Sequence, residues 1–188
     1  RKVMRYLKTF VSVAALLPAL AASSQAARPD DAQNCAALTG RHIGGAMIEK
    51  AAWQPEGGTV GTTQIAQSFC RVIGVATPTT DSHIGFEVWL PPASRWNGNF
   101  QAEGSGGSAG AISPGPMLTA LKAGYATMST DNGHLNDPKD PLGGSGQMWA
   151  YKHPEKMIDW AWRALHLSTV AAKKAVRQFY GREAGRNY

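Results

Sequence analysis

Cysteine is scarce in this sequence, and no stretch of the chain repeats another. Cys35 and Cys70 are the only cysteines, and neither has a histidine or a second cysteine at the spacing of metal ligands, so the sequence does not favour a metal or reactive-thiol site. Low-complexity tails and apolar heptads are also lacking, which excludes coiled coils. With 188 residues, the chain is long enough for one domain with a sizeable core.

A hydrophobic run long enough to cross a bilayer is lacking as well. The apolar stretch from Phe10 to Ala22 has about 13 residues and is interrupted by Pro18, whereas a transmembrane helix needs roughly 20. Four basic residues precede this stretch, and residues 24–26 offer a small-residue cleavage site. We therefore expect a signal peptide over residues 1–26, a secreted or periplasmic mature protein, and no membrane attachment after cleavage.

Outside this leader, basic and acidic residues are nearly balanced. The sequence has 19 basic and 13 acidic residues, but four of the basic ones and none of the acidic ones lie in residues 1–26, so the remainder carries a net charge of +2. No basic face with a recognisable nucleic-acid-binding module is visible, and nucleic acid is not an expected partner. The high isoelectric point mostly reflects the export signal.

Export gives the two cysteines a structural interpretation. An even number of cysteines in an oxidising compartment predicts a Cys35–Cys70 disulfide. Closing a loop of 36 residues would stabilise the fold by about 3 to 4 kcal/mol according to the chain-entropy argument.

The mature sequence predicts an α/β protein, in which a sheet is covered on its faces by helices. An irregular N-terminal arm over 27–67 includes one or two strands, for example residues 46–53, and residues 68–188 carry the remaining elements. These are an antiparallel pair of strands over 69–78 and 83–91, a helix over 116–124 that Gly124 ends, and a strand over 125–131.

A long helix over residues 155–180 is the clearest element. One apolar face collects residues at spacings of three, four and seven: Ile158, Ala161, Leu165, Ala172, Val176 and Phe179. Gly181 is expected to end the helix. A helix of this length is unusual in a globular domain and leaves room for a break near Leu167 or Ser168.

The glycine-rich loop over residues 101–115 admits three interpretations. Residues 104–109 match the dinucleotide pattern G-x-G-x-x-A, with Asp131 placed for a ribose, as in an oxidoreductase. Against this, the next helix is expected to start only after Pro114 and Pro116, too far away to place its dipole on a pyrophosphate. The loop could instead supply an oxyanion hole, as in α/β-hydrolases, or merely turn the chain in a non-catalytic secreted binding module.

Several polar residues resemble parts of a catalytic triad. Ser108 sits in a G-x-S-x-G string, but the residues after it cannot form the helix that a nucleophile elbow requires. Asp131 and His134 are three residues apart at a strand end and are expected to shape the loop by hydrogen bonding. His166 is expected to be a helix-face residue. Glu103 and Ser105 could line the mouth of a pocket.

Three segments together resemble the N-terminal part of the tannase and feruloyl esterase family, which includes bacterial hydrolases of terephthalate monoesters. They are "LPPASRWNGNFQAEGSGGSAG", "LKAGYATMSTDNGH" and "RALHLSTVAAKKAVRQFYG", followed by "NY". They contain the Trp96-Asn97-Gly98 turn, the Thr130-Asp131-x-Gly133-His134 motif and the Phe179-Tyr180-Gly181 helix end. The positions of Cys35 and Cys70 also fit the pairing of the family.

This resemblance implies the N-terminal part of an α/β-hydrolase fold over residues 27–188, truncated before the nucleophile elbow. Gly107, with Gly106 as the adjacent candidate, would present its backbone N–H to the oxyanion. The serine, aspartate and histidine of the triad would lie beyond Tyr188, so the chain itself is expected to be inactive. The parent enzyme would hydrolyse small esters of aromatic acids such as feruloyl or galloyl esters. No cofactor is expected in these residues, while calcium would belong to a lid domain of the parent.

Overall fold

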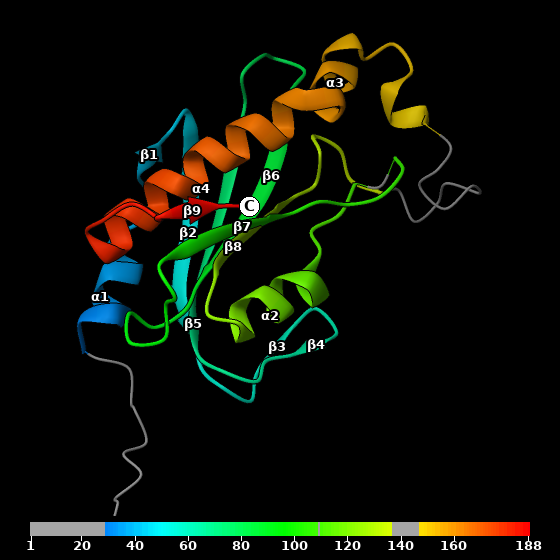
Figure 1. The fold of residues 1–188 in the computed structure, drawn as a ribbon. Coiled ribbons are helices and arrows are strands. Elements are labelled where there is room, and N and C mark those ends of the chain that lie inside the picture. Colours follow the sequence, from blue (N-terminus) through cyan, green and yellow to red (C-terminus); the bar gives the residue numbers. More distant parts are fainter. Residues whose placement is uncertain (1–28, 109, 137–146) are drawn as a thin grey trace, which may run out of the picture.

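The computed structural model describes residues 29–108, 110–136 and 147–188, so the predicted signal peptide over 1–26 lies outside the described residues. Its centre is a seven-stranded sheet with the order β1-β2-β5-β6-β8-β7-β9, and β3 and β4 form a separate hairpin (Figure 1). The strands are β1 His42–Ile43, β2 Ala46–Gln54, β3 Thr59–Val60, β4 Thr63–Gln64, β5 Phe69–Ala76, β6 Ile84–Leu90, β7 Asn99–Glu103, β8 Ala126–Thr130 and β9 Arg186–Asn187. The helices are α1 Pro29–Ala36, α2 Pro114–Lys122, α3 Pro154–Ile158 and α4 Ala164–Tyr180, with a 3₁₀ turn at Met148–Ala150 and a π-helical turn at Asp159–Arg163.

The sheet is mixed. Neighbouring strands among β1, β2, β5, β6 and β8 are antiparallel, and β5 and β6 form the predicted antiparallel pair, with Val72 opposite Val88. Strand β7 runs parallel to both β8 and β9, and the chain passes from β7 to β8 through α2. Because β7 and β8 are parallel, their carboxyl ends lie at the same edge of the sheet, where the glycine loop begins and residue 131 follows.

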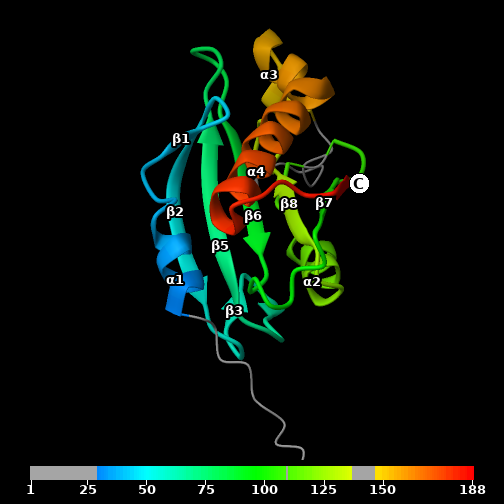
Figure 2. The same cartoon turned by 60° about the vertical axis from the view of Figure 1, so that its left-hand side comes forward.

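Helices cover both faces of the sheet, as the sequence predicts (Figures 1 and 2). Successive side chains of a strand point to opposite faces, so Val72 of β5 packs in one core cluster with Val176 of α4. On the other face, Phe69 packs with Trp89 and with Met117 of α2. None of the helices in the described ranges combines the length and apolar composition needed to span a bilayer.

The predicted N-terminal arm takes part in the main sheet. The expected strand at residues 46–53 is present as β2, which lies between β1 and β5. Helix α1 carries Cys35, which forms a disulfide with Cys70 of β5, with the two Cα atoms 5.6 Å apart and both side chains fully buried. The predicted pairing is present, and it ties α1 to the sheet.

The C-terminal helix is irregular at a different place from the one the sequence suggested. Leu167 and Ser168 lie inside regular α4, whereas the irregular segment is the π-helical turn over Asp159–Arg163. A π turn holds more residues than an α turn, and here Arg163 donates hydrogen bonds to Asp159 and Glu155 on the preceding turns. The end of the helix is as predicted, with Gly181 at a φ of +73°.

The predicted apolar face is correct only for the second half of this helix. Buried residues of the predicted set are Ala172, Val176 and Phe179, whereas Ile158, Ala161 and Leu165 are exposed. Each residue of an α-helix advances by about 100°, so the additional residue in the π turn moves Ile158 and Ala161 out of phase with the second half. Leu165 follows the turn in regular α4 and keeps the phase of Ala172, yet it is exposed.

Candidate functional site

The glycine loop leaves the sheet at the carboxyl end of β7 and reaches α2 at residue 114. Gly106 and Gly107, the predicted oxyanion residues, are both exposed. Gly107 has a φ of +62°, which L side chains rarely adopt, and a Cβ at either glycine would meet no atom within 4 Å. The two backbone amides therefore belong to an open loop that a small ligand can approach.

A hollow of about 250 Å³ lies beside this loop. Its lining joins Gly104, Ser105 and Gly107 of the loop and Asn132 after β8 to Trp160, Ala161, Trp162 and Leu165 of the π turn and α4. Trp160 and Trp162 are 37% and 57% exposed, so their rings offer apolar surface to a ligand. The predicted pocket role of Ser105 agrees with this lining.

Residues 132–136, which come after β8 and Asp131 in the sequence, hydrogen-bond to the glycine loop at three places. The contacts are Asn132 Nδ2 to Ser105 Oγ at 2.6 Å, His134 Nε2 to the Ser108 carbonyl oxygen at 2.9 Å, and the Gly110 N–H to Asn136 Oδ1 at 2.8 Å. The Asn136 N–H also donates to the Gly110 carbonyl oxygen at 3.0 Å. We call residues 132–136 the clamp loop.

His134 is held by a ring stack and by the close approach of Gly110. Its ring stacks on Trp149, with the ring centroids 3.8 Å apart and the planes 9° apart. A Cβ at Gly110 would lie 2.5 Å from its Cδ2 atom, so only glycine allows this approach. Because a carbonyl oxygen only accepts, His134 Nε2 carries the hydrogen in its contact with Ser108.

Asp131 is bound by backbone amides. Its Oδ1 accepts hydrogen bonds from the N–H groups of Gly85 at 3.0 Å and Gly133 at 2.8 Å. Burial raises the pKa of this carboxyl group to about 6, although the two amides and the nearby positive groups of His83 and Lys156 act in the opposite direction. Asp131 and His134 thus shape the loop, as the sequence predicts.

The geometry does not favour the dinucleotide interpretation. Helix α2 begins at Pro114, earlier than predicted, because proline is well tolerated in the first turn of a helix. Its N-terminus still lies five residues after the Gly104–Ala109 pattern, and the Asp131 carboxylate is engaged by amides rather than presented to a ribose. Neither the helix dipole nor the acidic group is placed as dinucleotide binding requires.

Ser108 and His166 lack the surroundings of triad members. The chain after Ser108 becomes helical only at Pro114, so the strand, sharp turn and helix of a nucleophile elbow are not formed around it. His134 contacts the Ser108 carbonyl oxygen rather than its hydroxyl group. His166 is an exposed residue of α4 whose ring lies 5.8 Å from that of Trp162, as expected for a helix-face residue.

Sequence reasoning missed the tryptophans of this site. Three of the six tryptophans of the chain, Trp149, Trp160 and Trp162, fall within 14 residues, and this clustering was the available signal. Trp160 and Trp162 reach the hollow beside the glycine loop from the π turn, and Trp149 stacks on His134, neither of which residue spacing reveals.

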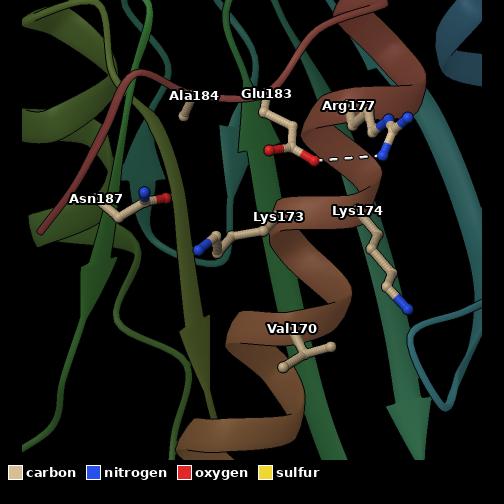
Figure 3. Close-up of a pocket in the computed structure, with 7 residues that line it drawn as sticks. All are labelled: Val170, Lys173, Lys174, Arg177, Glu183, Ala184 and Asn187. Atoms are coloured by element: carbon tan, nitrogen blue, oxygen red, sulfur yellow. Dashed lines mark hydrogen bonds and ion pairs between the residues drawn. The ribbon is translucent and has the colours of Figure 1, made fainter.

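A second hollow, of about 330 Å³, lies along the C-terminal half of α4 (Figure 3). Its lining contains Lys173, Lys174 and Arg177, and Arg177 pairs with Glu183 at 3.3 Å. None of the described residues that line it is aromatic, so it is less suited to an aromatic ligand than the hollow at the glycine loop. Within the described ranges, no group of three or more His, Cys, Asp or Glu residues is arranged to hold a metal ion.

Residues 70–188 match the profile of the family described as "Tannase and feruloyl esterase". An uncharacterized esterase of Xanthomonas campestris is 36% identical over 184 residues, which cover 95% of this chain and 29% of that protein. A probable feruloyl esterase B-1 of Neosartorya fischeri is 36% identical over 124 residues, which cover 66% of this chain and 22% of that protein. The chain therefore spans less than a third of the length of these relatives.

Solved structures show the same fold. The crystal structure of feruloyl esterase B from Aspergillus oryzae superposes with a TM-score of 0.72 at 27% identity, over 84% of this chain and 31% of that chain. Tannin acyl hydrolase from Aspergillus niger gives a TM-score of 0.55 at 20% identity, over 83% of this chain and 30% of that chain. The mixed sheet with its covering helices matches part of an α/β-hydrolase-like fold, as the sequence predicts.

Proposed function

Because the chain belongs to the tannase and feruloyl esterase family, we propose that it supplies the oxyanion-binding part of a secreted hydrolase that cleaves carboxylic esters of aromatic acids. One observation carries this proposal. Gly107, whose open backbone suits an oxyanion donor, lines the same hollow as Trp160 and Trp162, whose exposed rings suit an aromatic acyl group.

The reaction places negative charge on the carbonyl oxygen when a nucleophile attacks the ester. In the proposed role, the N–H of Gly107, with that of Gly106 beside it, faces this oxygen and donates a hydrogen bond that is strongest in the transition state. Removing one such donor costs about 2.7 to 4 kcal/mol of transition-state stabilisation in other hydrolases. Glycine suits this place because its backbone can approach the substrate closely at a positive φ.

The aromatic part of the substrate would lie against the tryptophan side of the hollow. Trp160 and Trp162 lie in the π turn on either side of Ala161, a small residue that also lines the hollow. An aromatic ring on an indole gains dispersion and stacking energy beyond the burial of apolar area, typically about 0.5 to 1.5 kcal/mol.

The nucleophile is proposed to be a serine activated by a histidine and an acid, all from the complete protein outside residues 29–188. Ser105 Oγ accepts a hydrogen bond from Asn132 Nδ2, and His134 donates to the carbonyl oxygen of Ser108 rather than to its hydroxyl group, so neither of these contacts places a histidine at a serine hydroxyl group as activation requires. The disulfide supports export to an oxidising compartment.

The proposal is tested by expressing the complete reading frame and comparing methyl ferulate, methyl gallate and a terephthalate monoester with methyl hexanoate. We expect saturable hydrolysis of at least one aromatic ester and a kcat/KM for it at least tenfold above that for the aliphatic ester. Hydrolysis of methyl hexanoate at an equal or greater kcat/KM would contradict the aromatic assignment, and no hydrolysis of any ester would contradict the proposal as a whole.

A further inference from the structure

We propose that Asn132, His134 and Asn136 of the clamp loop are positioning residues, which hold the glycine loop in the one conformation that directs the Gly106 and Gly107 amides at the reacting oxygen. This inference rests on the proposed function, because it assigns a purpose to the conformation of the same site. None of the three residues is proposed to touch the substrate through chemistry of its own.

The contacts lie where such a role requires them. Asn132 binds Ser105 on one side of the two glycines, and His134 binds Ser108 on the other side. A loop rich in glycine loses more backbone freedom on ordering than any other kind of loop, and donors of an active site must be held within about 0.5 Å of their productive positions. Fixing the residues on both sides of the donors restricts the peptide groups between them.

The third contact closes the far end of the loop. Gly110 and Asn136 exchange two hydrogen bonds, one through the Asn136 side chain and one through its backbone N–H. A Cβ at Gly110 would come within 2.3 Å of the His134 carbonyl oxygen and 2.5 Å of its ring, so the glycine is required for the two loops to lie so close. Gly110 therefore allows the close contact between the two loops, whereas a Cβ added at Gly106 or Gly107 would meet no atom within 4 Å.

The clamp loop is itself anchored to the sheet and can therefore transmit rigidity. The Asp131 carboxylate binds the amides of Gly85 in β6 and Gly133 in the loop, and the Asp131 N–H donates to the Gly85 carbonyl oxygen at 3.0 Å. Trp149 supports the His134 ring by stacking on its face. Contacts from β6 and from Trp149 thus fix the clamp loop, which in turn holds the glycine loop.

The experiment substitutes Asn136 and Asn132, which are exposed and half-buried respectively, because changes at these positions should leave the core intact. Asn136 is exposed, so Asn136→Ala removes the acceptor of the Gly110 amide without opening a buried cavity, and Asn136→Asp restores the acceptor oxygen. Asn132 has a φ of +59°, so Asn132→Gly removes its side chain without backbone strain. His42→Gln, at an exposed position of β1, is the control.

Two measurements are made on the protein from the complete reading frame: hydrogen exchange of the amides in residues 104–110, and kcat and KM for the best aromatic ester. We expect Asn136→Ala and Asn132→Gly to speed amide exchange in this segment and to lower kcat by about tenfold, with KM changed less than twofold. Asn136→Asp should recover exchange and most of kcat, and His42→Gln should match the wild type in both measurements.

Unchanged exchange in Asn136→Ala and Asn132→Gly would overturn the clamp. Faster exchange with unchanged kcat would overturn the positioning role. If the wild type hydrolyses no ester, the proposed function fails and the positioning role with it, and the exchange rates then decide separately whether the clamp loop orders the glycine loop.

Discussion

The ring of His134 lies flat on the indole of Trp149, with 3.8 Å between the ring centroids and 9° between the planes. Trp149 belongs to a short 3₁₀ turn that is distant in sequence from the glycine loop, yet through His134 it is one contact away from the Ser108 carbonyl oxygen. An aromatic side chain with no assigned chemistry therefore supports the shape of the candidate site.

Replacing this tryptophan should weaken the fold. We expect Trp149→Leu to lower the free energy of unfolding by about 1 to 3 kcal/mol, because the stack on His134 and part of the buried contact area are lost. Urea denaturation followed by circular dichroism measures the effect. Trp162→Leu is the matched control: this side chain is 57% exposed, and its loss should change stability by less than about 0.5 kcal/mol. Equal effects of the two substitutions would contradict the support assigned to Trp149.

The backbone amide of Gly107 is testable with proline. Gly107→Pro removes the N–H and forbids the φ of +62°, so we expect kcat/KM for an aryl ester to fall by at least about 100-fold in the protein from the complete reading frame. Ser108→Ala should change kcat/KM less than threefold, because its hydroxyl group has no proposed role. Gly115→Ala, where a Cβ meets no atom within 4 Å, is the control for altering a glycine. Abolished activity in Ser108→Ala alone would identify Ser108 as the nucleophile instead.

The disulfide should be formed throughout the mature protein and should stabilise it. Non-reducing peptide mapping is expected to recover Cys35 linked to Cys70 and no free thiol. The double substitution of both cysteines by alanine should lower the free energy of unfolding by about 2 to 5 kcal/mol, because the bond closes a long loop and its sulfur atoms are buried. Recovery of both cysteines alkylated without prior reduction would refute the linkage.

Asp131 should make stability fall as pH rises. Its folded-state pKa of about 6 lies above the ordinary value of 3.8, so the folded protein binds this proton more tightly than the unfolded chain does. The stabilising contribution is present in full below pH 3.8 and is lost as pH rises through 6, by about 3 kcal/mol in total. Urea denaturation of the wild type and of Asp131→Asn between pH 4 and 8 isolates the contribution of this residue to the free energy of unfolding. The advantage of the wild type over the variant should shrink with rising pH, and a constant difference would contradict the raised pKa.

The sequence predicted the elements whose side chains follow a simple period. Strands β5 and β6, with their alternating apolar residues, and the C-terminal half of α4, with Ala172, Val176 and Phe179, are where the pattern placed them. The predicted face is wrong at Ile158 and Ala161 because the π turn at Asp159–Arg163 adds a residue to the period, and it is also wrong at Leu165, which follows the turn and is exposed. Arg163 of that turn donates a hydrogen bond to Ser82, a tertiary contact that leaves no periodic trace in the sequence.

The residues of the candidate site also divide into those that the sequence predicts and those that only the structure reveals. Gly106 and Gly107 were proposed from the glycine pattern and a family resemblance, and they lie on an open loop beside a hollow. Asn136 could not be identified beforehand, because a single asparagine has no spacing rule that pairs it with a distant loop. Its role follows from the parallel arrangement of β7 and β8, which brings residues 104–110 and 131–136 to one edge. The clustering of tryptophans marks Trp149, but its stack on His134 has no trace in the sequence.

The last prediction is that the 188-residue chain alone hydrolyses no ester. A serine becomes a nucleophile only when a histidine within hydrogen-bond reach takes its proton and a further group orients that histidine. Among the described residues, His134 donates to a carbonyl oxygen and stacks on Trp149, and Asp131 is bound by two amides, so neither serves Ser105 or Ser108 in this way. An oxyanion donor without an activated nucleophile has no bond-forming step to stabilise. The purified chain is assayed with aryl acetates and methyl ferulate, and its rate should equal that of buffer. Saturable turnover that disappears in Ser108→Ala or His134→Gln would show instead that these residues form a working centre after a rearrangement of the clamp loop.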